Sequence, residues 1–358
     1  MLKLGQKAIG DALDSRDNSL NFIRLLLATS VIFWHTYPLT GVQPEWPAFL
    51  LGTWAVNGFF AISGYLIAGS RLRLEFGTFM WRRAVRIYPA FWMVLIITAF
   101  VFAPLSVLVS HRSYNVWDAV NYILQNMTLW LGELAVGDTL SGVPHHDSWN
   151  GSLWTLFFEF GAYVTAGVLL SFPFVRKHQV AVLTTVLLVL SAAVATRFGD
   201  GSLGVVDRAV PALRLWAFFV SGMLVFALRG RLRTNAAVGI VATLLFSLTW
   251  ALGVQNWAGP LPFAVLLLWL GAVMTTRVGV KNDISYGMYI YAFPVQQLVV
   301  VFGFSAVAGA EWSALLAVAL TVPLAYASWR FLELPLQRAS RNWKPSFGPA
   351  FGAGPQRQ

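Results

Sequence analysis

Ionisable residues inside apolar stretches of this chain are the candidates for chemistry. The first pair, Arg24 and His35, lies in the run NFIRLLLATSVIFWHTYPL. At ~100° and ~1.5 Å per residue, a helix places both on one face, about 16 Å apart along its axis. Ionisable groups in such a run are costly unless they face a protein interior or a wet cavity, so they indicate function. The alternative is a headgroup contact for Arg24 and a structural hydrogen bond for His35.

A basic patch follows in the segment FMWRRAVRIYP, where Arg82, Arg83 and Arg86 share helical spacing at the start of an apolar run. Free N–H groups at a helix start and guanidinium forks both suit phosphate. We therefore predict that a phosphorylated cytoplasmic ligand binds here, with Tyr88 beside it. An anchor for lipid headgroups is the alternative.

A single carboxylate, Glu159, lies in the run NGSLWTLFFEFGAY. It is roughly 12 Å into a helix that starts near Gly151, at a depth similar to that expected for His35. A carboxylate beside an imidazole fixes its tautomer and raises its basicity, which turns histidine into a general base for a hydroxyl. Glu159 would either orient His35 or bind an acceptor; a protonated, structural role is the alternative.

Two further stretches carry weaker signals. In VNGFFAISGYL, small residues around Ser63 predict close helix packing with an inward hydroxyl, although ordinary packing between spans explains the spacing equally well. His145, His146 and Asp147 are adjacent in the chain. Three consecutive side chains do not easily ligate one ion, so we predict no metal. The absence of cysteine excludes disulfides and thiolate chemistry.

The composition of the chain indicates that these residues lie in a membrane protein. Of the 358 residues 57% are hydrophobic and only 11% are charged, whereas soluble domains average about 25% charged. The chain is therefore predicted to be an all-α polytopic membrane protein. Its net charge of +10 comes from short basic clusters between apolar runs, which is typical of cytoplasmic loops and does not indicate nucleic acid binding.

Ten runs are long enough to span a bilayer. They fall at about 20–40, 47–70, 80–108, 150–174, 179–197, 209–229, 234–253, 257–276, 284–306 and 311–333. Most of the 25 basic residues then face the cytoplasm with both termini, and the outer loops keep Arg112, Arg197 and Arg208. The stretch 116–131 is predicted to be a loop helix at the membrane surface. Residues 1–19 form a cytoplasmic segment, 20–336 the membrane domain and 337–358 a disordered cytoplasmic tail.

The motifs, taken in order, resemble acyltransferase family 3, from about Asn18 to Arg338. The matching residues are Arg24 and His35; Phe59, Phe60, Ser63, Gly64 and Tyr65; Arg83 and Arg86; Leu153, Trp154, Leu156 and Glu159; Ser285, Tyr286 and Tyr289; and Phe331, Glu333 and Pro335. One departure is Phe293-Pro294, where many members have His-Pro, so we assign position 293 no chemistry.

The resemblance implies an enzyme that moves an acyl group, acetyl in particular, from cytoplasmic acyl-CoA to a hydroxyl of a cell-envelope glycan or glycolipid. It also implies a place in the cell membrane, the bacterial inner membrane, among membrane lipids, and a possible hand-over to a separate partner protein. The expected donor-binding residues are Arg24, Ser63, Arg82, Arg83, Arg86 and Tyr88. The expected catalytic residues are His35 and Glu159, and those for the acceptor are Asn150, Trp154 and Tyr286.

Two other classes stay open from the sequence. A transporter or flippase could use Arg24, His35 and Glu159 as a charge relay. Transporters often show paired hydropathy halves, and this chain shows none. A membrane glycosyltransferase would require a carboxylate near the outer surface, for which Glu159 is the candidate.

Overall fold

The computed structural model describes residues 2–15, 18–43, 48–110, 112–198, 209–276, 278–279 and 281–342. Every named element in these ranges is a helix, and the β pairing there consists of two isolated bridges, Leu2 with Met274 and Ala8 with Arg233. The predicted all-α class is therefore confirmed.

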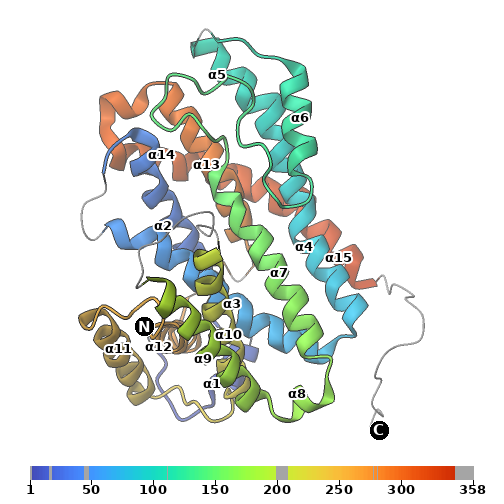
Figure 1. Ribbon diagram of the computed structural model, residues 1–358, viewed down its shortest axis with the longest axis vertical. Coiled ribbons are helices and arrows are strands. Elements are labelled where there is room, and N and C mark those ends of the chain that lie inside the picture. Colours follow the sequence, from blue (N-terminus) through green and yellow to red (C-terminus); the bar gives the residue numbers. More distant parts are fainter. Residues whose placement is uncertain are drawn as a thin grey trace.

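Fifteen α-helices follow one another along the described chain (Figure 1). They are α1 (Ile9–Asp14), α2 (Leu20–Thr40), α3 (Ala48–Arg73), α4 (Phe76–Ile97), α5 (Ala103–Ser110), α6 (Val116–Asn126), α7 (Trp154–Leu169), α8 (Pro173–Lys177), α9 (Gln179–Phe198), α10 (Ala209–Ala227), α11 (Ala236–Ala251), α12 (Pro260–Val273), α13 (Ser285–Val301), α14 (Phe304–Ser328) and α15 (Leu334–Asn342). Short π-helical turns at Thr98–Phe102 and Trp329–Glu333 join α4 to α5 and α14 to α15.

Six helical segments in the described chain are long and apolar enough to cross a membrane: Leu20–Thr40, Phe76–Ser110, Gly151–Leu169, Gln179–Thr196, Val210–Ala227 and Phe304–Asn342. The other four predicted spans are occupied by α3, α13 and the shorter apolar helices α11 and α12. The chain is thus a multi-pass membrane protein. The count of ten spans and the cytoplasmic placement of both termini stay predictions.

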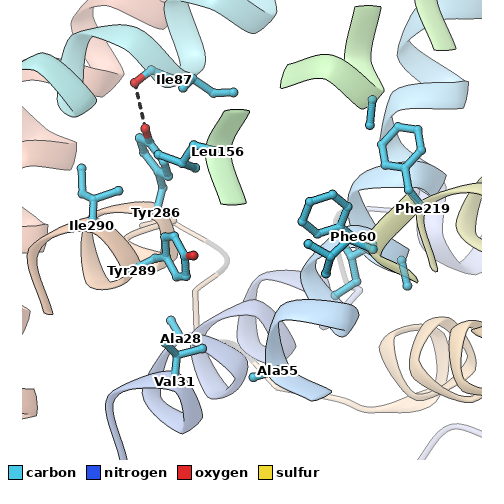
Figure 2. Close-up of a cluster of buried hydrophobic side chains, with 14 of the residues drawn as sticks. Ala28, Val31, Ala55, Phe60, Ile87, Leu156, Phe219, Tyr286, Tyr289 and Ile290 are labelled. Atoms are coloured by element: carbon cyan, nitrogen blue, oxygen red, sulfur yellow. Dashed lines mark hydrogen bonds between the residues drawn. The ribbon is translucent and has the colours of Figure 1, made fainter. Parts of the chain in front are cut away.

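The centre of the molecule is α13, in which nearly every side chain is buried. It packs against α2, α4 and α14. Figure 2 shows Tyr286 and Tyr289 of α13 between Ile87 of α4, Leu156 of α7 and Val31 of α2. A helix with no exposed face needs partners on every side, and this arrangement brings the polar segments of α2, α4 and α7 toward one region.

A close contact between α3 and α10 confirms the predicted small-residue packing. A Cβ placed on Gly64 would lie 1.9 Å from the Phe219 carbonyl oxygen, and one on Gly222 would lie 1.9 Å from that of Ala61. Only glycine allows the two backbones to approach this closely. The contact fixes the rotation of α3 and thereby the direction of Ser63.

Two predicted segment boundaries differ from the structure. The loop helix in 116–131 ends at Asn126 as α6, whose 11 residues span about 16 Å and so cannot cross a bilayer. The tail predicted to be disordered from 337 begins as helix, because α15 runs to Asn342 and packs against α4. Residues 343–358 of that tail lie outside the described ranges.

Candidate active site

A cavity of about 310 Å³ lies between α2, α3, α4, α7 and α13. Its lining contains residues that the sequence assigned to the donor, to catalysis and to the acceptor. They are Arg24, Ser63, Arg83, Arg86, Glu159 and Tyr286. Since five helices supply them, we call this space the charged cavity. It is the first of two cavities that the chain forms at opposite ends of α2.

Asp283 is the shared partner of two arginines in the charged cavity. Its Oδ2 accepts from Arg24 Nη1 at 2.7 Å and from Arg86 Nη2 at 2.8 Å, and its Oδ1 accepts from Ser285 Oγ at 2.7 Å. Burial alone would raise the pKa of the Asp283 carboxyl, but Arg24 and Arg86 outweigh burial and hold that pKa well below its usual range. The cluster keeps both guanidinium groups charged and oriented.

A second carboxylate reaches the same cluster from the π-helical turn after α14. Glu333 Oε2 lies 4.0 Å from Arg86 Nη1, and its side chain is only 2% exposed. The extra residue of a π-turn redirects the side chains that follow it, and such turns are frequent at functional sites. Arg86 also lies over the ring of Tyr286, 5.9 Å from its centroid, and the Tyr286 hydroxyl donates to the Ile87 carbonyl oxygen at 2.8 Å (Figure 2).

Arg83 differs from Arg24 and Arg86 because it has no acidic partner among the described residues. Its Nε is buried and makes no hydrogen bond to any described residue. A buried donor without a partner is costly, and an oxyanion in the cavity would satisfy it. Arg82 has a buried, unpartnered Nε as well, although it does not line the charged cavity.

Glu159 is held by two hydroxyl groups. Its Oε1 accepts from Ser63 Oγ at 2.9 Å and from the hydroxyl of Tyr163, one turn later on α7. The expected orientation of His35 by Glu159 therefore differs from the structure, in which Glu159 pairs with Ser63 and Tyr163. The reason is geometric: all three residues line the charged cavity, and His35 does not.

His35 lies on α2 beyond the lining of the charged cavity. Its Nδ1 is 3.0 Å from the Val31 carbonyl oxygen. Since a carbonyl only accepts, Nδ1 carries the proton and Nε2 keeps its lone pair, as a general base requires. The imidazole meets the ring of Phe293 edge to face at a centroid distance of 5.3 Å. Phe293 follows Tyr289, which lines the cavity, by one turn of α13.

Three other predicted site residues lie away from the charged cavity. Asn150 is buried and fastens the chain to α13 through its Nδ2, which donates to the Ile290 carbonyl oxygen at 2.9 Å. Tyr88 packs against Trp92 and Phe160, and Trp154 packs against Phe158. In the structure these residues have packing partners instead of a place in the cavity.

Sequence reasoning missed Asp283 and Tyr163. The available signal for Asp283 was its position two residues before Ser285, at the start of a helix that carries a tyrosine motif. Tyr163 lies one turn after Glu159, a spacing at which side chains on a helix meet. Neither residue stands out in sequence, because aspartate in a loop and tyrosine in a span are both common.

Comparison with known proteins identifies the family of the chain. A family model described as an acyltransferase domain matches residues 17–330. The O-acetyl transferase of Shigella phage Sf6 is 30% identical over 335 residues, covering 89% of this chain and 95% of that protein. Nodulation protein 10 of Rhizobium leguminosarum bv. viciae is 26% identical over 356 residues, covering 90% and 93%. No solved structure matches the chain. The chain therefore belongs to acyltransferase family 3 and is a multi-pass membrane acyltransferase.

Proposed function

We propose that the protein is an O-acyltransferase that takes an acetyl group from cytoplasmic acetyl-CoA and transfers it to a hydroxyl of a cell-envelope glycan or glycolipid. The observation that carries the proposal is the placement of a basic, partly unsatisfied cavity and a histidine with an available Nε2 along one helix, α2. The O-acetyl transferase among the relatives supports acetyl as the transferred group.

The donor would bind through its phosphates at the arginine end of the charged cavity. Arg83 is the principal contact, because its buried Nε has no partner among the described residues, and Arg82 would extend the contact outside the lining. Arg24 and Arg86 keep their charge through Asp283 and would complete the positive field. The pantetheine arm would then run past Tyr289 toward His35.

The transfer itself needs one proton acceptor. His35 Nε2 takes the proton of the acceptor hydroxyl as its oxygen attacks the thioester carbonyl carbon. The carbon–sulfur bond breaks, and the CoA thiolate leaves and recovers the proton from the imidazolium. Val31 holds Nδ1–H throughout, which keeps Nε2 directed to the reaction. Glu159 would act through Ser63 and Tyr163, whose hydroxyls it fixes at the cavity wall.

The setting we propose is the bacterial inner membrane, with both termini in the cytoplasm and the acceptor on the outer side. Many large apolar side chains on α9 and α11 are exposed, among them Leu188, Val189 and Leu244, as lipid-facing surfaces require. With this orientation, acetyl-CoA reaches Arg24 from the inner side. A separate protein could complete delivery to the final acceptor.

Two measurements test the proposed function. Acetyl-CoA should raise the unfolding temperature of the purified full-length protein, and CoA should do so too because it carries the same phosphates. Mass spectrometry of envelope glycans and glycolipids should find an acetyl increment in cells with the wild-type chain and none with His35→Ala. If neither acetyl-CoA nor CoA binds the purified protein, acetyl-CoA is not the donor and the proposed function is wrong.

A further inference from the structure

A second cavity, of about 470 Å³, lies at the other end of α2 from Arg24. Its lining includes Thr40 in the last turn of α2, residues 139–144 of the loop before α7, and the turn from α13 to α14. Figure 1 shows α5, α6 and this loop gathered at one end of the molecule, with α8 at the opposite end. We call this space the loop cavity. Nothing in the family assignment gives it a function.

The loop cavity is a built site, because buried hydrogen bonds hold its loop on both sides. Ser106 Oγ of α5 donates to the Thr139 carbonyl oxygen at 2.9 Å, and Trp149 Nε1 donates to Thr139 Oγ1 at 2.8 Å. From α13, Gln297 Nε2 donates to the carbonyl oxygens of His145 and Ser148, both at 2.7 Å. The cavity size falls within the ~300–1,000 Å³ typical of small-molecule sites.

The lining indicates the chemistry of a ligand. Arg112 is the one charged residue among the described lining residues, and it has no ion pair within the described chain. Hydroxyl groups come from Thr40, Ser110, Thr139, Ser141 and Ser305. Such a set of one guanidinium and several hydroxyls fits a hydroxylated ring that carries an oxyanion.

One carboxylate stands close to this lining. A Cβ placed on Gly309, a lining residue, would lie 3.8 Å from Glu311 Oε2. The other oxygen of Glu311 accepts from the Tyr37 hydroxyl at 3.4 Å. Glu311 could accept a hydrogen bond from a sugar hydroxyl, whereas the oxyanion would lie at Arg112.

A short series of packed side chains connects the loop cavity to His35. Val143 and Val300 line the cavity and pack in a small apolar cluster with Phe293 and Leu39. On its other side, Phe293 meets the His35 ring at a centroid distance of 5.3 Å. The valine side chains that line the loop cavity are therefore connected to the proposed base through Phe293.

We propose that the loop cavity is the acceptor site, that it takes an acidic sugar bearing a carboxylate or phosphate, and that Arg112 binds this oxyanion. Phe293 lies between the valines that line this cavity and the ring of His35. The proposal rests on the proposed function, and it adds to that function the class of acceptor and the residue that selects it. It also gives Phe293, to which the sequence assigned no chemistry, a position between the valines of the loop cavity and His35.

The experiment uses the absence of cysteine in the natural chain. Ser141→Cys places one thiol in the loop cavity beside Gly142, whose Cβ position is 3.7 Å from Arg112 Nη2. Membrane-impermeant methanethiosulfonates, one with a sulfonate and one with a trimethylammonium group, are added to spheroplasts. Met127→Cys, which lies outside the cavity lining, corrects for the intrinsic reactivity of the two reagents.

We expect the sulfonate reagent to be favoured about fivefold at Ser141→Cys after this correction. Arg112→Gln in the same background should remove the preference and Arg112→Lys should keep it. Arg112 is exposed, so neither variant should unfold the protein. Equal rates for the two reagents, or a preference that survives Arg112→Gln, would overturn the proposal.

Ligand protection then tests the class of acceptor. Glucuronate or glucose 1-phosphate should slow labelling at concentrations at which glucose and inorganic phosphate do not, and the stronger of the two identifies carboxylate or phosphate. Equal protection by glucose, or by inorganic phosphate alone, contradicts an acidic sugar. Acetyl-CoA binding is measured on the same preparations. If acetyl-CoA binds but the labelling shows no charge preference, only the acceptor site is rejected. If acetyl-CoA does not bind the wild-type protein, the proposed function is rejected.

Discussion

The charged cavity and the loop cavity lie at opposite ends of α2, and they are built in different ways. Residues of α2, α3, α4, α7, α13 and α15 line the charged cavity, and ion pairs from Arg24 and Arg86 to one carboxylate fix its side chains. An irregular loop closes the loop cavity, where hydrogen bonds to the backbone hold the walls and Arg112 stays unpaired within the described chain.

This difference follows from depth. Unpaired charges in the interior of a membrane protein are expensive; Arg24 and Arg86 are paired with Asp283 there, and Arg83 has no acidic partner among the described residues. A loop at the end of the helices reaches water, so a free arginine costs little. Under the proposed function, the charged cavity holds paired side chains in place for the donor, and the loop cavity binds the acceptor.

The largest effect should come from the residue between the cavities. His35→Ala removes the base for the acceptor hydroxyl and should lower acetyl transfer at least 100-fold. Acetyl-CoA binding should change less than twofold, because His35 does not line the charged cavity. His178→Ala, an exposed histidine on the turn between α8 and α9, is the matched control. Near-normal transfer by His35→Ala would remove histidine from the mechanism.

Loss of the shared carboxylate should damage the charged cavity alone. Asp283→Asn leaves Arg24 and Arg86 buried without a full counter-charge and should lower the free energy of unfolding by about 3 kcal/mol. The lowered pKa of Asp283 means that this stabilisation is complete above pH ~4 and is lost only as the pH falls below that value. Thermal unfolding should therefore show the same stability difference between the wild type and Asp283→Asn at pH 7 and at pH 5. A difference that disappears at pH 5 would show that Asp283 is not the ionised partner.

Removing the guanidinium of Arg83 should weaken binding of the donor and leave the loop cavity unchanged. Arg83→Gln should reduce acetyl-CoA affinity about tenfold, as expected for the loss of a charge-assisted contact to phosphate, and should leave reagent preference at Ser141→Cys unchanged. Arg176→Gln, on α8 and away from both cavities, serves as the control. Equal affinity in Arg83→Gln and the wild type would place the donor phosphates elsewhere.

Substitution of Phe293 should have a smaller effect, and it should raise hydrolysis of acetyl-CoA. Phe293→Ala opens a passage for water to His35 and should raise acetyl-CoA hydrolysis without acceptor severalfold, while transfer falls. Phe293→Leu keeps an apolar side chain and should stay close to the wild type. Lower hydrolysis in Phe293→Ala than in the wild type would contradict a role of Phe293 in keeping water away from His35.

The smallest effect concerns a residue that sequence alone placed in the donor site. Tyr88→Phe should change acetyl-CoA affinity less than twofold, since Tyr88 contacts Trp92 and Phe160 outside the charged cavity. Isothermal titration with acetyl-CoA checks this expectation. A tenfold loss of acetyl-CoA affinity would show that Tyr88 does belong to the donor site.

Residue type and spacing were enough to find the arginines of the charged cavity and Glu159, but not Asp283. Arg24, Arg83 and Glu159 are conspicuous because each is a charge in an apolar run, and the energetic cost of such a group indicates function without any coordinates. Asn150 is polar and lies at the start of a predicted span, but in the structure its Nδ2 donates to the backbone of α13, and its role toward the acceptor stays a prediction.

What the sequence by itself determined is the class of molecule, the helices and the charges that need partners, because these depend on local composition and period. Only the tertiary structure decided which partners they have: Asp283 for two arginines, Ser63 and Tyr163 for Glu159, and Phe293 for His35. Pairing depends on how helices distant in the chain rotate and pack, and contacts such as that of Gly64 with the backbone of α10 set this rotation. No local pattern encodes it.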